Sequence, residues 1–325
     1  MRVLVLGGTA FFGREIVRLF HEAGHAVAVF TRGNIYPKDF PPVRRICGDR
    51  KNIRDLEKAN QLASWDLVID NIAYQGTDIK IALQAFPSIK HYILTSTISV
   101  YRYSRSQFGV PLDESNVDWT LAPPSENLTN IHWSYARGKL DAEQALREST
   151  LTPWTIFRPT VVYGPNDVLE RGFWYLGRML KGGAILLAGD KQGAFRLAYS
   201  HDIATLYLTT ALKQKGFSRI YNVAMEEKIS LREFCIESAK VLNVRPTFYE
   251  LKSNEVDEAL LGPLANLSDV FPLIDRAKAD LDYKATPWPS VARSTALWFC
   301  DHWKGDETKL YQTRAKELEV AKKGI

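Results

Sequence analysis

After Met1 the chain reads Arg2-Val3-Leu4-Val5-Leu6-Gly7-Gly8-Thr9-Ala10-Phe11-Phe12-Gly13, an apolar run that breaks into a glycine-rich turn. Residues 14–23 follow with apolar side chains at helical spacing. A strand, a glycine turn and a helix in this order are typical of a dinucleotide-binding βαβ unit. The glycines let the backbone approach a pyrophosphate, and the helix N-terminus supplies unpaired N–H groups and a positive dipole to hold it.

Bulk composition excludes several classes of protein. The 325 residues are 46% hydrophobic and 24% charged, as in an ordinary globular protein of one or two domains. A net charge of +5 with no long block of like charge gives no reason to expect nucleic acid as a partner. No apolar run is long enough to span a membrane. The three scattered cysteines predict neither a disulfide framework nor a metal cluster, and they favour a reducing, cytoplasmic location.

Strand and helix patterns alternate through the first 160 residues. We expect a helix over 134–147 and strands over 2–6, 26–31, 43–47, 66–70, 91–95 and 154–157, the last stopped by Arg158-Pro159. Such alternation predicts an α/β fold in which helices cover both faces of a parallel sheet, a Rossmann-type doubly wound arrangement.

The pattern becomes irregular after Gly164-Pro165, which predicts a second lobe. We expect a dinucleotide-binding domain at 1–164, with 196–226 returning to its sheet. A smaller mixed α/β substrate lobe is expected at 165–195 and 227–303. Because residues 304–325 mix both signs of charge, we expect a charged helical tail that is solvated.

One pair of side chains carries chemistry. Tyr135 and Lys139 are four residues apart on an expected helix, which places them on one face. An ammonium group beside a phenol favours the phenolate, so the pKa of Tyr135 is expected to fall, and Tyr135 could exchange a proton with a carbinol oxygen. Thr97 offers a hydrogen-bonding partner in the loop after strand 91–95, where ligands bind in open α/β sheets.

These motifs resemble the extended short-chain dehydrogenase/reductase superfamily, in its NAD(P)-dependent epimerase/dehydratase-like branch. The resemblance runs from Met1 to about Val223. It rests on five motifs in the usual order, namely the turn at 7–13, Thr97-Ile98-Ser99-Val100-Tyr101, Tyr135-x-x-x-Lys139, the run Arg158-Pro159-Thr160-Val161-Val162-Tyr163-Gly164-Pro165, and His201-Asp202-Ile203-Ala204.

The resemblance implies roles for individual residues. Tyr135 would be the catalytic acid/base, Lys139 would hold the nicotinamide ribose and lower the tyrosine pKa, and Thr97 would bind the substrate oxygen. The implied cofactor-binding set is Gly7, Thr9, Ala10, Phe11, Phe12, Gly13, Arg32, Asp49, Asn71, Ala73, Thr95, Tyr135, Lys139, Pro159 and Val162. Within it, Asp49 would lie near the adenine, although an aspartate there can also simply cap a turn.

Three departures from the family pattern qualify this interpretation. Ala10 replaces the middle glycine, and its methyl group would crowd the pyrophosphate, although the branch with Gly-Gly-Thr-x-Phe-x-Gly tolerates the change. Arg32 directly follows strand 26–31, at the position where an acid would hold a ribose 2′-hydroxyl. An arginine at this position favours the 2′-phosphate of NADP over NAD, unless Arg32 is only a solvated turn residue. Ile98 and Ser99 replace the Asp-Glu pair of the sugar 4,6-dehydratases, so we do not expect that activity.

A zinc-protease pattern, His21-Glu22-Ala23-Gly24-His25, also occurs. Both imidazoles reach one metal only on an unbroken helix. Because Gly24 is expected to end the first helix, we predict no metal site.

The expected function is an NAD(P)-dependent oxidoreductase or epimerase that transfers hydride at a carbinol or ketone carbon, with a nucleotide-sugar as the small-molecule substrate. The alternative is a non-catalytic nucleotide- or RNA-binding member of the same fold. Because family members often dimerise through the helix that carries the tyrosine and its neighbour, the resemblance also implies a homodimer.

Overall fold

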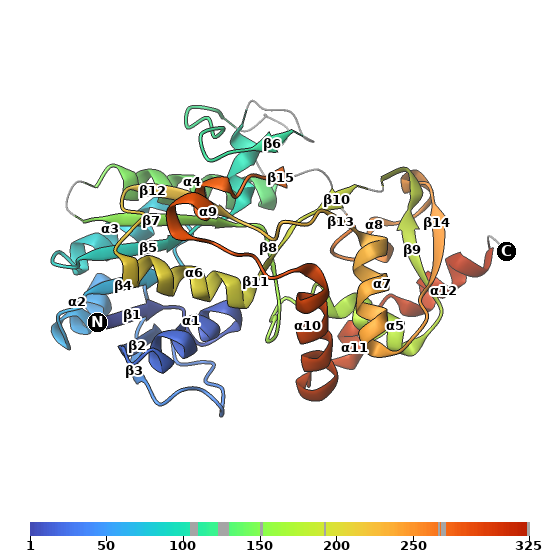
Figure 1. The fold of residues 1–325 in the computed structure, drawn as a ribbon, viewed down its shortest axis with the longest axis horizontal. Coiled ribbons are helices and arrows are strands. Elements are labelled where there is room, and N and C mark those ends of the chain that lie inside the picture. Colours follow the sequence, from blue (N-terminus) through green and yellow to red (C-terminus); the bar gives the residue numbers. More distant parts are fainter. Residues whose placement is uncertain are drawn as a thin grey trace.

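Seven parallel strands form the central sheet (Figure 1). The computed structural model describes residues 1–104, 110–122, 130–149, 152–191, 193–265, 267 and 271–323. The strands lie in the order β12-β7-β5-β4-β1-β2-β3. Their bounds are β1 (Arg2–Leu6), β2 (Ala26–Thr31), β3 (Arg44–Cys47), β4 (Leu67–Asp70), β5 (His91–Thr95), β7 (Trp154–Pro159) and β12 (Arg219–Val223). The expected doubly wound Rossmann-type sheet is therefore confirmed.

β7 is longer than the sequence predicts. We expected Arg158-Pro159 to stop this strand, but Arg158 pairs with Asn222 and Pro159 pairs with Val223. A proline lacks only its own N–H, and the next N–H, that of Thr160, donates to the carbonyl of Val223 at 3.0 Å. The ladder thus continues past the proline and carries it to the edge of the sheet where ligands bind.

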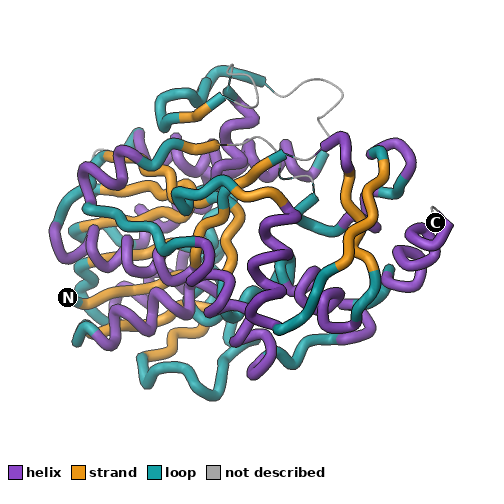
Figure 2. The backbone as a smooth tube through the Cα atoms, turned by 45° about the vertical axis from the view of Figure 1, so that its right-hand side comes forward, coloured by secondary structure: helices purple, strands orange, loops and turns teal. Residues whose placement is uncertain are grey.

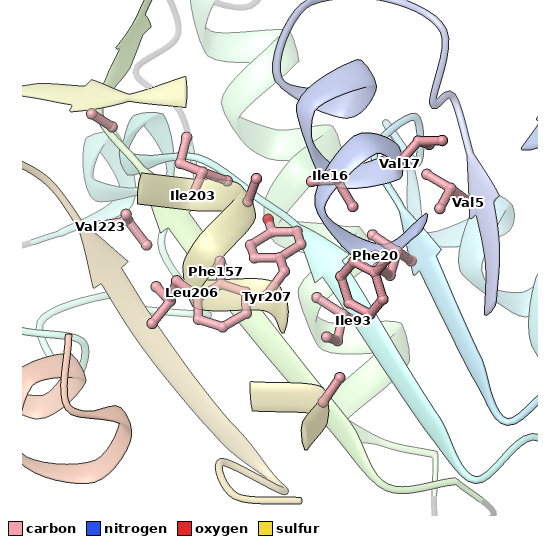
Figure 3. Close-up of a cluster of buried hydrophobic side chains, with 14 of the residues drawn as sticks. Val5, Ile16, Val17, Phe20, Ile93, Phe157, Ile203, Leu206, Tyr207 and Val223 are labelled. Carbon is pink, nitrogen blue, oxygen red and sulfur yellow. The ribbon is translucent and has the colours of Figure 1, made fainter. Parts of the chain in front are cut away.

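Helices cover both faces of the sheet. One face carries α1 (Phe11–Glu22) and α6 (Ser200–Lys213), and the other carries α2 (Ile53–Gln61), α3 (Gly76–Ala85) and α4 (Ile131–Arg147). Figure 3 shows the core beneath α1 and α6, where side chains of both helices meet those of the strands. In this core the rings of Phe157 and Tyr207 stack with centroids 4.6 Å apart.

The second lobe is joined to the sheet by β8 (Val161–Tyr163) and β11 (Leu197–Tyr199), which pair in parallel. Figures 1 and 2 show it beside the sheet domain. Its other elements are α5 (Phe173–Lys181), β9 (Ala184–Ala188), β10 (Ala194–Phe195), β13 (Ile229–Ser230), α7 (Leu231–Leu242), β14 (Thr247–Leu251), α8 (Glu258–Leu261), α10 (Trp288–His302), α11 (Glu307–Leu310) and α12 (Arg314–Lys323).

Short elements complete the described chain. They are β6 (Pro111–Leu112), β15 (Phe271–Pro272), α9 (Asp275–Leu281) and the 3₁₀ turns η1 (Ile98–Tyr103), η3 (Gly189–Lys191) and η4 (Ser253–Glu255). η1 follows β5 directly, so the loop expected to carry Thr97 begins a turn of helix, with the Thr97 hydroxyl accepting from the N–H of Ser99 at 3.2 Å. We propose the domain division given above on this arrangement, with α11 and α12 assigned to the second lobe.

The histidines of the zinc-protease pattern do not share a helix. α1 ends at Glu22, and Gly24 has a φ of +77°, in the left-handed region. His25 lies beyond this turn, where its Nδ1 is 3.4 Å from the amino group of Met1. The two imidazoles therefore lack the helical register that a common metal ion would require.

The C-terminal residues differ from the expected solvated tail. Arg178 of α5 is fully buried, and its guanidinium donates to both carboxylate oxygens of Glu317 in α12, at 2.9 and 2.6 Å. It also donates to the carbonyl of Leu310 at 2.7 Å. Composition could not reveal this because only the tertiary fold decides which of the tail's charges find a buried partner. α12 is an integral part of the second lobe.

This buried ion pair gives a stability prediction. Glu317→Ala leaves the Arg178 guanidinium buried without its counter-charge, so we expect the free energy of unfolding to fall by about 3–5 kcal/mol. Urea denaturation followed by circular dichroism measures the loss. Glu307→Ala is the control because Glu307 makes only an exposed ion pair with Lys181, worth at most about 1 kcal/mol. Equal stability of the two variants would contradict a structural role for α12.

Candidate active site

The glycine turn forms a cradle at the end of β1. Gly7 has a φ of +78°, which favours glycine. At Gly13 a Cβ atom would lie 2.5 Å from the carbonyl oxygen of Gly7, so only glycine lets α1 approach the turn this closely. The helix N-terminus is thereby held directly over the end of the strand.

The donors of this cradle are available to an anion. Ala10 is the N-cap of α1, and within the described residues no side chain caps the helix and no acid lies in its first turn. The N–H groups of that turn therefore keep their hydrogen-bonding capacity and the positive end of the helix dipole. These features fit the pyrophosphate of a dinucleotide.

Ala10 itself fits the backbone at its position. Its φ of −131° and ψ of 150° are extended values that any residue adopts. The unusual conformation falls on Phe11, whose φ is +47°. Such a value in a bulky residue stores strain of the kind found at ligand sites. Thr9 is buried in the same turn.

Asn71 and Thr95 connect this cradle to the neighbouring strands. The hydroxyl of Thr95 donates to the side-chain oxygen of Asn71 at 2.6 Å and lies 2.9 Å from the hydroxyl of Tyr207. The Asn71 amide in turn lies 3.5 Å from the carbonyl of Gly7. Ala73, by contrast, is fully buried in the core under α3, behind the surface of the site.

Arg32 follows β2 and Asp49 follows β3, both at the carboxyl ends of their strands. Both are exposed, and the Asp49 carboxylate accepts from the N–H of Lys51 at 2.9 Å, the turn-capping contact considered as the alternative. The neighbouring Arg50 is a residue that sequence reasoning missed. It is buried and pairs with Asp70 and Asp78, which joins the end of β4 to α3. No local pattern distinguishes such an arginine from a solvated one.

A cleft of about 820 Å³ opens between the two lobes and brings most of the candidate residues together. Nine of the expected site residues line it, namely Phe11, Phe12, Asn71, Thr95, Thr97, Tyr135, Lys139, Pro159 and Val162. They come from the glycine turn, the ends of β4 and β5, α4, and the β7–β8 segment. The cleft therefore lies at the carboxyl edge of the sheet.

The Lys139 ammonium is held by a backbone carbonyl of the neighbouring strand rather than by the tyrosine hydroxyl. It donates to the carbonyl of Thr95 at 2.8 Å and lies 4.8 Å from the ring centroid of Tyr74. Burial lowers the pKa of Lys139 to about 8. The i, i+4 spacing gave the right face of α4, but it could not show that the ammonium is drawn inward.

The expected lowering of the Tyr135 pKa by Lys139 is wrong for this structure. Tyr135 as a whole residue is 39% exposed, but the protein around its hydroxyl desolvates that group, and this burial raises the pKa of Tyr135 above the ordinary tyrosine value. The influences that lower this pKa are a hydrogen bond with Thr97 and the charge of Arg171. The phenol is thus the dominant form near neutral pH.

A buried ion pair fixes the helix that carries these residues. Glu143, one turn beyond Lys139 on α4, pairs with Arg158 of β7 at 2.6 Å, and both side chains are fully buried. Ser96, directly after β5, donates to the same carboxylate at 2.5 Å. Arg158 was predicted only as part of a motif, and Glu143 was missed, although a glutamate four residues after a functional lysine is a usable signal.

A family model described as the NAD dependent epimerase/dehydratase family matches residues 3–224. The chain belongs to this family. It is an NAD(P)-dependent enzyme of the extended short-chain dehydrogenase/reductase type, so the resemblance seen in the sequence is confirmed. The family's redox chemistry is compatible with the cradle and cleft described above.

Two curated proteins and a solved structure illustrate the relationship. The chain is 24% identical over 299 residues to the chloroplast stem-loop binding protein of 41 kDa b from Arabidopsis thaliana, covering 87% of this chain and 75% of the relative. It is 27% identical over 223 residues to 2-alkyl-3-oxoalkanoate reductase from Stenotrophomonas maltophilia, covering 63% of each. UDP-glucose 4-epimerase from Thermus thermophilus in complex with NAD has 18% identity and a TM-score of 0.72, covering 93% of this chain and 100% of that one.

No helix in the described ranges has the length and apolar character to cross a membrane.

The cradle gives a binding prediction. Gly13→Ala puts a methyl group against the Gly7 carbonyl, so α1 must move away, and NADPH affinity should fall at least about tenfold, or about 1.4 kcal/mol. Fluorescence titration of the bound nucleotide measures the change. Ala10→Gly is the matched control, because glycine is accepted at an N-cap and restores the family residue, so its affinity should match the parent's. Similar affinities for both variants would rule out the cradle as the pyrophosphate site.

Proposed function

We propose that the chain catalyses hydride transfer at a carbinol or ketone carbon of a nucleotide-activated sugar, with Tyr135 as the acid/base. The observation that carries this proposal is the cleft, where Tyr135, Thr97 and Lys139 line the same space as the phenylalanines of the glycine turn. The substrate class is supported by the Thermus relative, which is named as a UDP-glucose epimerase.

The residues of the cleft have distinct roles in the proposed reaction. When bound, the nicotinamide supplies or accepts the hydride. As a carbonyl carbon is reduced, the Tyr135 phenol donates its proton to the oxygen and later regains one from solvent. In the reverse direction the phenolate accepts the proton of the carbinol. The Thr97 hydroxyl binds the same oxygen and fixes its distance from Tyr135.

Lys139 is a positioning residue in this proposal. Its ammonium, held by the carbonyl of Thr95, presents its remaining N–H donors at the cleft wall, where they can bind the ribose of the nicotinamide half. Lys139 would thus hold the ribose of a bound nicotinamide nucleotide beside Tyr135, and its influence on the phenol would act through the ribose hydroxyls.

Tyr135→Phe tests the acid/base role. The variant keeps the ring but loses the transferable proton, so we expect kcat to fall by about 10²–10⁴ while the affinity for NADPH stays within about twofold. Nucleotide absorbance follows turnover, and fluorescence titration follows binding. Tyr249→Phe, in β14 of the second lobe, is the control and should turn over like the parent. Full activity of Tyr135→Phe would refute the mechanism.

We also propose that the preferred cofactor is NADP. Arg32 is exposed at the end of β2, where its guanidinium can pair with a 2′-phosphate. Arg32→Ser should weaken NADPH binding about tenfold and leave NADH binding unchanged, because only the former carries the phosphate. Arg54→Ser, an exposed arginine at the start of α2, controls for the lost charge. Equal losses for both nucleotides would show that Arg32 does not recognise the phosphate.

Epimerisation and reduction differ in what the protein retains. An epimerase returns the hydride and keeps its cofactor, whereas a reductase exchanges it. Nucleotide released from the purified protein separates the two: tightly held oxidised NAD indicates epimerisation, and an empty protein that takes up NADPH indicates reduction.

A second candidate function is RNA binding. The Arabidopsis relative is named as a stem-loop binding protein, and it matches along most of this chain. Titration of a labelled stem-loop at rising salt tests this candidate, since phosphate contacts weaken steeply with ionic strength. Absence of binding at low salt would eliminate it.

The homodimer also remains a proposal. The faces of α3 and α4 would form it, and a groove of about 610 Å³ runs between these helices. A monomeric mass by light scattering would contradict it.

A further inference from the structure

The segment between β8 and α5 holds Arg171 in a defined position. Asn166 and Glu170 both adopt left-handed φ values, +62° and +53°, which are uncommon away from glycine. The carboxylate of Glu170 accepts from the indole N–H of Trp303 at 2.9 Å. These contacts fix the backbone directly before Arg171, whose side chain lines the cleft. Backbone strain of this kind is maintained where it positions a functional group.

Arg171 has no hydrogen-bonded partner among the residues that the structure describes. Across the described residues it makes no hydrogen bond and no ion pair, and its Nε is buried without an acceptor. The other deeply placed arginines behave differently: Arg158 pairs with Glu143, and Arg178 pairs with Glu317. Because a guanidinium has five donors and its burial is costly without acceptors, the missing partner is expected to come from a ligand.

The nearby acid does not neutralise Arg171. Asp167 is buried and its Oδ1 accepts from the N–H of Leu169 at 2.9 Å, while its Oδ2 has no hydrogen-bond partner. Asp167 makes no ion pair with Arg171 within 4.0 Å in the described structure, and burial raises the pKa of its carboxyl to about 6. The two groups lie near each other without forming the contact that would occupy the guanidinium.

The cleft as a whole is cationic. Its described lining includes Arg102, Lys139, Arg171 and Arg196, and no aspartate or glutamate is among the described lining residues. Arg196 also has a buried Nε without an acceptor, although it donates from Nη1 to the carbonyl of Pro272 at 2.9 Å. A concave surface of one sign concentrates ligands of the other sign. The described lining therefore favours an anionic ligand.

We infer that the substrate carries a carboxylate on the carbon next to the reacting carbinol carbon, and that Arg171 binds this carboxylate. The inference rests on the proposed function, because Tyr135 marks where the reacting carbon lies. Arg171 and Tyr135 line the same cleft, and the Arg171 charge is among the influences that lower the Tyr135 pKa. We therefore place the group that contacts Arg171 close to the carbon whose oxygen contacts Tyr135. The pyrophosphate of a nucleotide-sugar is several bonds farther from the reacting carbon, so we assign it to the other cations of the cleft lining.

UDP-glucuronic acid and UDP-glucose form a matched pair of probes. They differ only in bearing a carboxylate or a hydroxymethyl group on the carbon beside C4. Isothermal titration of the whole chain with each nucleotide-sugar should show at least about tenfold tighter binding of the acid, as expected for a charge-assisted bidentate contact. Arg171→Gln should abolish this preference and change the affinity for UDP-glucose by less than about threefold.

Two further variants keep this result interpretable. Arg245→Gln removes the same charge from an exposed site in the second lobe and should retain the preference. Arg171→Lys keeps the charge but loses the planar guanidinium that can donate to both carboxylate oxygens. This variant should therefore retain only part of the preference for UDP-glucuronic acid. Thermal melts of each variant report whether it is folded. A parent protein that binds both sugars equally, or an Arg171→Gln variant that still prefers the acid, would overturn the inference.

Small probes separate a failure of the inference from a failure of the proposed function. Acetoacetate and acetoacetamide have the same shape and differ in charge, and dihydroxyacetone phosphate offers a phosphate instead. If neither UDP-sugar binds, the nucleotide-sugar proposal fails, whereas an Arg171-dependent preference for acetoacetate in an NMR titration still supports the carboxylate. Tighter binding of dihydroxyacetone phosphate than of acetoacetate would assign the anion to a phosphate ester and overturn the carboxylate assignment.

Discussion

The buried ion pair between Glu143 and Arg158 is the contact on which the site depends. It fixes α4 against β7, and Ser96 extends the contact to the end of β5. α4 presents Tyr135 and Lys139, so their positions relative to the strand ends are set by a charge pair about one and two helical turns away. Loss of either partner would leave an uncompensated charge in the core. The position of α4 therefore depends on both partners being present.

The sheet could be predicted because its signals are local. The strands at 2–6, 26–31 and 91–95 match the structure residue for residue, since each is an apolar run bounded by a turn. The strand end was misplaced at Phe157 because Pro159 was expected to end the strand. The pairing with β12 continues because the N–H of the following residue, Thr160, still donates to the neighbouring strand. Local patterns thus identify the elements better than their ends.

The charges of the site could not be predicted, because their partners are distant in the chain. Arg50, Arg158, Arg171 and Arg178 look alike in the sequence. Three are paired with carboxylates, whereas Arg171 lines the cleft and forms no ion pair within the described residues. The direction of Lys139 was missed for the same reason: the carbonyl that attracts it belongs to Thr95, 44 residues earlier. Motifs located the cleft, whereas its electrostatic character required the fold.

The buried ion pair between Arg178 and Glu317 has a consequence for biosynthesis. All seven strands of the main sheet precede residue 224, so that sheet can assemble while the ribosome is still translating the remainder. The second lobe has to wait for α12 before the guanidinium of α5 meets its carboxylate. A nascent chain can therefore have all its main-sheet strands available for pairing while the guanidinium of α5 still lacks its carboxylate partner.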